Sequence, residues 1–90
     1  MFVVISYDLP SDKRRTKLAK LLSAHGDRVQ YSVFETHLDA RDLNRLRAKV
    51  RKLIDPLEDS VRFYKIPSPD EAIEIEGLGA VTEKLELIII

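Results

Sequence analysis

Residues 2–8 (FVVISYD) limit the possible folds of this 90-residue chain more than any other segment. The segment is short and rich in β-branched residues, which is typical of a strand. Val3, Ile5 and Tyr7 lie on one face of such a strand, while the other face begins with apolar residues and ends at Asp8. Because both faces start apolar, we expect a central strand that is covered on both sides.

Two helices are indicated by capping residues followed by apolar residues at helical spacing. Ser11 is a suitable N-cap for the first helix, and Gly26 a suitable stop after it. Asp39 is the expected N-cap of the second helix, in which basic residues line the side opposite the apolar stripe. The expected buried residues are Leu18, Leu21 and Leu22 in the first helix, and Leu43, Leu46, Val50, Leu53 and Ile54 in the second.

Three further segments, residues 28–38, 59–66 and 72–76, contain many strand-forming residues or alternate as an edge strand does. The pattern of residues 28–38 fits either one bent strand or a pair of strands. The chain ends in an apolar run, and we expect residues 81–90 to form a C-terminal strand that packs on a partner subunit.

The order of these elements predicts one domain over residues 1–90, an α+β ferredoxin-like sandwich. Its antiparallel sheet carries two helices on one face and gains the extra C-terminal strand. The helices leave the other sheet face open. We expect Val4, Phe34 and Tyr64 on that open face, which is too apolar for water and suits a homodimer interface.

The net charge of zero conceals a strong segregation of charge along the chain. Residues 12–52 contain twelve Lys or Arg against five Asp or Glu, whereas residues 53–90 contain three against nine. A basic half of this kind is compatible with nucleic-acid binding, although solvated helix faces produce the same pattern.

The chain has no cysteine, which excludes disulfides and thiolate metal sites and favours an intracellular location. Its N-terminus lacks the basic leader of a signal peptide, and no apolar run reaches the roughly 20 residues that span a bilayer. We therefore expect a cytoplasmic protein without a membrane partner.

Asp8 is the residue whose position most calls for a chemical explanation. A carboxylate at the end of an apolar strand is either paired with another group, caps the following turn or binds a cation. A two-fold axis near this strand end would bring two copies of Asp8 together, and such carboxylates repel unless a proton or metal lies between them. Mg²⁺ is often bound by one or two carboxylates, so the pair could share one ion.

The other candidate residues each have a structural and a functional interpretation. Tyr7 is either core or catalytic, and Ser32 either approaches Asp8 from the next strand or is an interface serine. Arg14, Arg15 and Lys17 either steer phosphates toward Asp8 or are solvated residues of the first helix.

The sequence resembles the small CRISPR-associated endonuclease of spacer acquisition, the smaller of the two universal CRISPR adaptation proteins. The motifs that carry the resemblance are YDLP at 7–10, RRTKLAKLL at 14–22, Gly26, VQYSVFE at 29–35 and DSVRFY at 59–64. They extend over nearly the whole chain. Leu9 replaces a more frequent isoleucine.

The resemblance implies a ferredoxin-like homodimer in which Asp8 of both subunits binds Mg²⁺ or Mn²⁺ and hydrolyses phosphodiesters of RNA or DNA. It also implies that the dimer bridges a partner integrase and carries the incoming duplex during spacer integration. By motif, the catalytic positions are Asp8, Tyr7 and Ser32. The nucleic-acid-binding positions are Arg14, Arg15 and Lys17, and Phe34 is assigned to the dimer interface.

Three hypotheses follow for the function. The first is a metal-dependent endonuclease, and the second is a non-catalytic nucleic-acid-binding scaffold of the integration complex. The third is a regulatory ferredoxin-like module for a small ligand, which leaves the basic helices unexplained.

Overall fold

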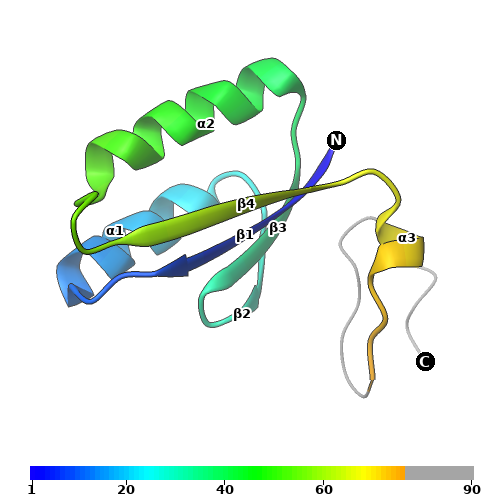
Figure 1. Ribbon diagram of the computed structural model, residues 1–90, viewed down its shortest axis with the longest axis horizontal. Coiled ribbons are helices and arrows are strands. Elements are labelled where there is room, and N and C mark those ends of the chain that lie inside the picture. Colours follow the sequence, from blue (N-terminus) through cyan, green and yellow to red (C-terminus); the bar gives the residue numbers. More distant parts are fainter. Residues whose placement is uncertain (77–90) are drawn as a thin grey trace.

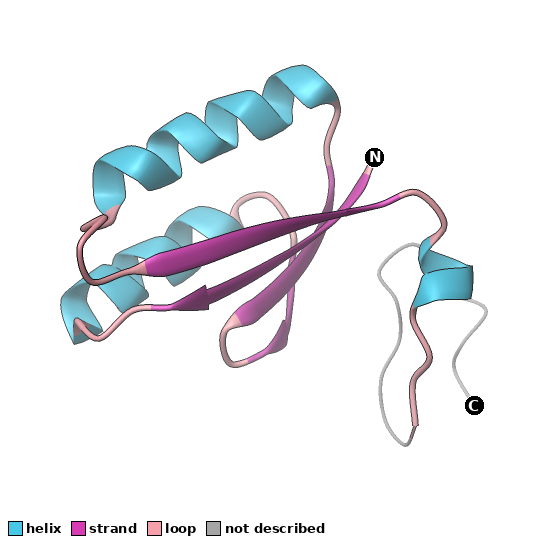
Figure 2. Cartoon of the chain, in the orientation of Figure 1, coloured by secondary structure: helices cyan, strands magenta, loops and turns pink. Residues whose placement is uncertain are grey.

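The computed structural model describes residues 1–76, which form an antiparallel sheet with two long helices on one face (Figure 1). The strands are β1 (Phe2–Asp8), β2 (Asp27–Gln30), β3 (Val33–His37) and β4 (Ser60–Ile66), in the spatial order β2-β3-β1-β4. The helices are α1 (Asp12–Ser23), α2 (Ala40–Leu53) and the short α3 (Pro69–Ala72). This is the predicted α+β ferredoxin-like sandwich, and Figure 2 shows α1 and α2 in one layer.

The core lies between the sheet and the helix layer. The central strand β1 pairs antiparallel with β3 on one side and β4 on the other, and it buries Val3, Ile5 and Tyr7 against the helices. The helices contribute the predicted leucines and valine of their apolar stripes to the same cluster: Leu18, Leu22, Leu43, Leu46 and Val50. Burial of these side chains stabilises the domain by about 1.5–3 kcal/mol each.

Both predicted N-caps are confirmed. The Ser11 side chain accepts a hydrogen bond from the backbone N–H of Arg14 at 3.2 Å, and Asp39 accepts one from that of Asp42 at 2.8 Å. Each satisfies a helix N–H that has no partner within the helix. The second helix ends at Leu53, and Ile54, which was expected among its buried residues, is its extended C-cap.

Residues 28–38 form two strands, which the sequence pattern left undecided. The register between β2 and β3 shifts between Arg28 and Gln30, as it does at a β-bulge. Phe34 is paired with Ile5 and is only 1% exposed in the core. The prediction that Phe34 lies on the open face is therefore wrong, since its side chain packs within its own protomer.

The predicted edge strand over residues 72–76 is also wrong. The backbone N–H groups of Glu71 and Ala72 donate to the Ser68 carbonyl and close the short helix α3. Residues 73–76 then join no strand within the described part of the chain, because alternation alone supplies no pairing partner. The predicted C-terminal strand over residues 81–90 lies outside the described residues. Within residues 1–76, no helix has the length and apolar character needed to cross a membrane.

Candidate functional site

Asp8 is the exposed last residue of β1 and lies on the open face of the sheet, as predicted. In the sheet register it pairs with Ser60 of β4, and Ser6 pairs with Arg62. The side chains surround a hollow of about 210 Å³, which Tyr7 also lines. Within residues 1–76 the Asp8 carboxylate has no hydrogen bond or ion pair, so nothing there supports the alternative that it caps the following turn.

One protomer offers too few ligands to hold a metal ion by itself. No group of three His, Cys, Asp or Glu with suitable geometry occurs among the described residues. Asp8 contributes a single carboxylate, and the hydroxyl groups of Ser6 and Ser60 are the other oxygen donors that line its hollow. These hard oxygen ligands suit Mg²⁺ or Mn²⁺, which is usually bound by one or two carboxylates together with several waters.

Arg62 places a positive charge beside Asp8. Its Nη1 group donates to the Tyr64 hydroxyl oxygen at 3.3 Å, an interaction that raises the pKa of Arg62 and keeps it cationic. Sequence reasoning assigned no role to Arg62 or Ser60. The signal that could have identified them is the alternation of residues 60, 62 and 64, which places them on the same face as Asp8 once β4 pairs with β1.

Tyr7 points away from Asp8, into the helix-covered core. Its side chain is 5% exposed, and its hydroxyl lies 3.4 Å from the carbonyl oxygen of Tyr31. Its backbone N–H donates to the Ser32 carbonyl at 3.1 Å. The structure therefore places Ser32 next to the end of β1 through its backbone, while the ring of Tyr7 lies on the opposite face from the carboxylate.

Arg14 forms an internal ion-pair cluster instead of an open phosphate contact. Its guanidinium donates to Asp59 at 2.7 and 3.2 Å and to Glu58 at 2.8 Å. These hydrogen bonds raise the pKa of Arg14 and lower the pKa of the Asp59 carboxyl. The Asp59 side chain is completely buried, and it also accepts a hydrogen bond from the backbone N–H of Asp55. The assignment of Arg14 to nucleic-acid binding is therefore not favoured, because carboxylates already satisfy its charge.

Arg15 is half-buried and already has partners, whereas Lys17 is available at the surface. The Arg15 guanidinium donates to the Leu9 carbonyl at 2.7 Å and forms an ion pair with the exposed Asp12 within the same helix. It lines a hollow of about 340 Å³ that lies between α1 and the β2–β3 turn. Lys17 is exposed and has no ion-pair partner within the described chain.

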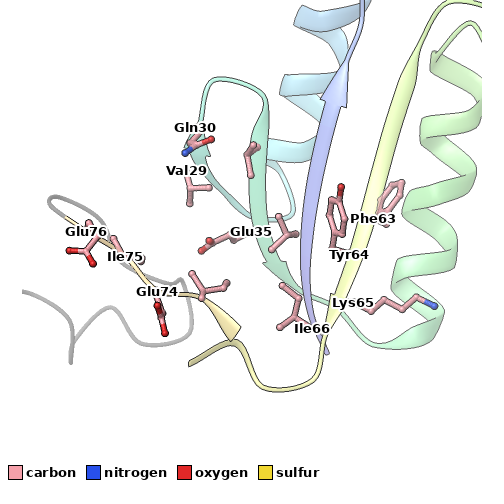
Figure 3. A pocket seen from close by; sticks show the side chains of 13 residues that line it. Val29, Gln30, Glu35, Phe63, Tyr64, Lys65, Ile66, Glu74, Ile75 and Glu76 are labelled. Atoms are coloured by element: carbon pink, nitrogen blue, oxygen red, sulfur yellow. The ribbon is translucent and has the colours of Figure 1, made fainter. Parts of the chain in front are cut away.

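The open sheet face forms a groove of about 880 Å³ in which apolar side chains alternate with charged ones such as Glu35, Lys65 and Glu74 (Figure 3). Val4 and Tyr64 line it from the sheet, as predicted, and Ile73 and Ile75 line it from the segment after α3. Tyr64 is 45% exposed, so a large aromatic ring on this face is open to solvent. An exposed apolar surface of this kind is typical of a protein interface.

Comparisons with known proteins agree with this geometry. The family model described as CRISPR associated protein Cas2 matches residues 1–72. A Chloroflexus aurantiacus protein named CRISPR-associated endoribonuclease Cas2 3 is 48% identical over 83 residues, which cover 91% of this chain and 89% of that protein.

Solved structures extend the comparison to the fold. Streptococcus pyogenes Cas2 has 31% identity and a TM-score of 0.77, covering 86% of this chain and all of that one. A chain solved in a partial Cas6-RT-Cas1–Cas2 complex has 33% identity and a TM-score of 0.71, covering 83% of this chain and 88% of that one. The protein therefore belongs to the Cas2 family of CRISPR-associated proteins.

Proposed function

We propose that this protein acts as a homodimeric, metal-dependent endonuclease that cleaves RNA or DNA and takes part in spacer integration. The observation that carries the proposal is Asp8, an exposed carboxylate without a partner in residues 1–76, at the edge of an apolar open face. Endoribonuclease is the activity named for the Chloroflexus aurantiacus relative.

Dimerisation through the open face would provide the second carboxylate. Val4, Tyr64 and Ile66 give this face apolar side chains, of which Tyr64 is exposed and the other two are half-buried among residues 1–76. Asp8 lies on the same face, at the end of β1, so a two-fold axis near that end would bring the two carboxylates together. Two adjacent carboxylates repel each other, and a divalent cation between them removes the repulsion.

The two Asp8 carboxylates would hold the Mg²⁺ or Mn²⁺ ion, with the nearby serine hydroxyls as additional oxygen donors. When bound, the ion supplies charge neutralisation at the phosphate and activation of the attacking water. Arg62 lines the same hollow and can bind a phosphate oxygen of the substrate. Ser60 can orient the same phosphate through its hydroxyl group.

Tyr7 and Ser32 then have supporting roles. Tyr7 packs in the core and its N–H bonds to the Ser32 carbonyl, so together they fix the backbone that carries Asp8. Arg15 and Lys17 are the remaining predicted contacts for the nucleic acid.

Substitution of Asp8 tests the nuclease proposal directly. Asp8→Asn retains the size of the side chain but removes its charge. We expect cleavage of labelled RNA and DNA in Mg²⁺ or Mn²⁺ to fall on the order of 100-fold or more, as for loss of a positioned catalytic group. Asp27→Asn is the matched control, because Asp27 is also exposed but is the first residue of the edge strand β2, paired with Glu35 and outside the Asp8 hollow. Equal cleavage by Asp8→Asn and the parent protein would contradict the proposal.

A scaffold role is the second candidate, favoured by the similar chain that was solved in a complex with Cas1. In this role the dimer bridges two copies of the partner integrase and contributes nucleic-acid binding without cleavage. Asp8→Asn separates the two roles when the complex is assembled with the partner and duplex DNA. Loss of cleavage with intact integration would show a nuclease that integration does not need, whereas absence of cleavage in the parent protein would leave the scaffold role alone.

A further inference from the structure

A column of planar groups extends from the core to the surface at the β2–β3 turn. The rings of Tyr7 and Phe34 are both buried and stacked, with centroids 6.3 Å apart and planes inclined by 24°. The guanidinium carbon of Arg28 lies 5.7 Å from the Phe34 ring centre and 4.9 Å from that of Tyr31. Tyr31 is 74% exposed, so the column ends in an aromatic ring that faces solvent.

Arg28 fixes the position of this exposed ring. Its Nε group donates to the Tyr31 carbonyl at 2.9 Å, and Nη2 donates to the same oxygen. The guanidinium plane is thus tied to the turn, and cation–π attraction adds about 0.5–1 kcal/mol at an exposed site. A ring that is already positioned loses little conformational entropy when a ligand stacks on it.

Two guanidinium groups, of Arg15 and Arg28, lie beside the ring, and the carboxylate of Asp12, the ion-pair partner of Arg15, lines the same hollow. Arg28 has no carboxylate partner among residues 1–76, since its only hydrogen bonds there are to a neutral carbonyl oxygen. Arg15 lines the adjacent hollow of about 340 Å³ together with Tyr31. Two guanidinium groups beside an exposed aromatic ring suit a ligand that combines a flat base with a phosphate.

We propose that Tyr31, supported by Arg28, is a stacking site for one unpaired base of a single-stranded nucleic acid. A base within a duplex is stacked on its neighbours and cannot offer its face to a side chain, so the site selects single strands. This inference rests on the proposed role in nucleic-acid chemistry and adds the form of the substrate.

The position of the column connects the stacking site to Asp8. Tyr7 lines the hollow next to Tyr31 and also the hollow of Asp8, which is its neighbour in the chain. In this proposal a strand with one base on Tyr31 would pass around the end of β1, because the two hollows lie on opposite faces of the sheet at that end. The stacking site would hold the strand while the adjacent backbone enters the Asp8 hollow.

Binding of a labelled oligo-dT single strand, compared with a duplex of the same length, tests this proposal. We expect Tyr31→Ala to weaken single-strand binding roughly 5- to 150-fold, the usual effect of losing one stacked base, and to change duplex binding less than about twofold. Tyr31→Phe keeps the ring and is the matched control, with affinity close to that of the parent. A single abasic position in the oligonucleotide should reproduce the loss with the unaltered protein, which avoids any effect on folding.

Tyr31→Trp provides a direct readout of stacking, because the chain contains no tryptophan. We expect the single strand to quench its fluorescence and the duplex to quench it far less. Equal weakening of single-strand and duplex binding by Tyr31→Ala would overturn the proposal. The proposal would also be overturned if Tyr31→Ala bound the single strand as the parent does but changed the oligomeric state, because Tyr31 would then be a contact between protein chains. If Tyr31→Ala binds normally while Asp8→Asn loses cleavage, the stacking site fails and the proposed function stands.

Discussion

At the scale of single residues, Gly26 is required by a close contact between helix and sheet. A Cβ atom at this position would lie 2.3 Å from the Glu35 carbonyl oxygen and 2.6 Å from the Cβ of Thr36. The sequence predicted this glycine as a helix stop. In the structure α1 ends before it, at Ser23, and Gly26 lies where the chain passes closely over β3.

Gly26→Ala should therefore destabilise the protein. The added methyl group meets backbone, which cannot rotate away, so we expect the free energy of unfolding to fall by about 1–3 kcal/mol, as in overpacked sites. Urea denaturation measures this change. Ser23→Ala, at an exposed position of the neighbouring helix turn, is the control and should stay within about 0.5 kcal/mol. A Gly26→Ala variant as stable as the parent would show that the strand moves away freely.

The Arg14–Asp59 ion pair predicts how stability depends on pH. Hydrogen bonds from Arg14, and a weaker contribution from the Asp55 N–H, lower the pKa of Asp59 below its ordinary value of 3.8, although burial opposes them. The unfolded chain therefore binds a proton at Asp59 more tightly than the folded chain does. This contribution to stability is fully present above about pH 4 and is lost as the pH falls through the folded-state pKa.

Asp59→Asn should remove the contribution of Asp59 to the loss of stability at acid pH. We expect the variant to be less stable than the parent near neutral pH, with a difference that narrows as the pH falls toward about 3. Urea unfolding at a series of pH values measures it, and Asp27→Asn, at an exposed carboxylate, provides the comparison. A constant difference between Asp59→Asn and the parent at every pH would mean that Asp59 acts only through packing.

At the scale of elements, α2 shows what local sequence determines. Its cap at Asp39, its buried stripe and its basic outer side were all predictable, because a helix depends on hydrogen bonds and spacings within a few residues. The pairing of β3 with β1 was not predictable. Phe34 faces the helices because it pairs with the core residue Ile5, and that register joins strands that are distant in sequence.

Of the candidate site, the part that lies on one strand could be predicted from the sequence, and the part that depends on strand pairing could not. Asp8 could be identified because its position follows from the alternation of one strand. Ser60 and Arg62 were missed because their relation to Asp8 depends on the register between β1 and β4, which are distant in sequence. The ion pair of Arg14 with Asp59 joins two such distant segments as well.

The exposed basic side of α2 is a further surface for the phosphate backbone. Arg41, Arg45 and Lys49 follow one another at helical spacing and are all exposed. If each contacts a phosphate of duplex DNA, then replacement of each by Gln should lower the slope of log affinity against log salt by about 0.9. Asn44→Ala, a neutral exposed position of the same helix, should leave the slope unchanged. An unaltered slope in the triple Gln variant would mean that these cations are only solvated.

At the scale of the whole molecule, the two faces of the sheet differ in what covers them. One face is covered by α1 and α2 and forms the core, and their outer sides carry most of the positive charge of residues 12–52. The other face carries a groove with the exposed ring of Tyr64, and it ends at Asp8. In the proposed dimer, this face would therefore bring together both the interface and the two Asp8 carboxylates.

The binding stoichiometry of Mn²⁺, measured by electron paramagnetic resonance, tests this shared site most directly. We predict one tightly bound ion for every two chains in the dimer, because each chain contributes one Asp8 carboxylate. Asp8→Asn should abolish this binding while the dimer persists, and Tyr64→Glu, which places a charge on the open face, should lose both the dimer and the ion. One ion per single chain, or tight binding that survives Asp8→Asn, would contradict the account.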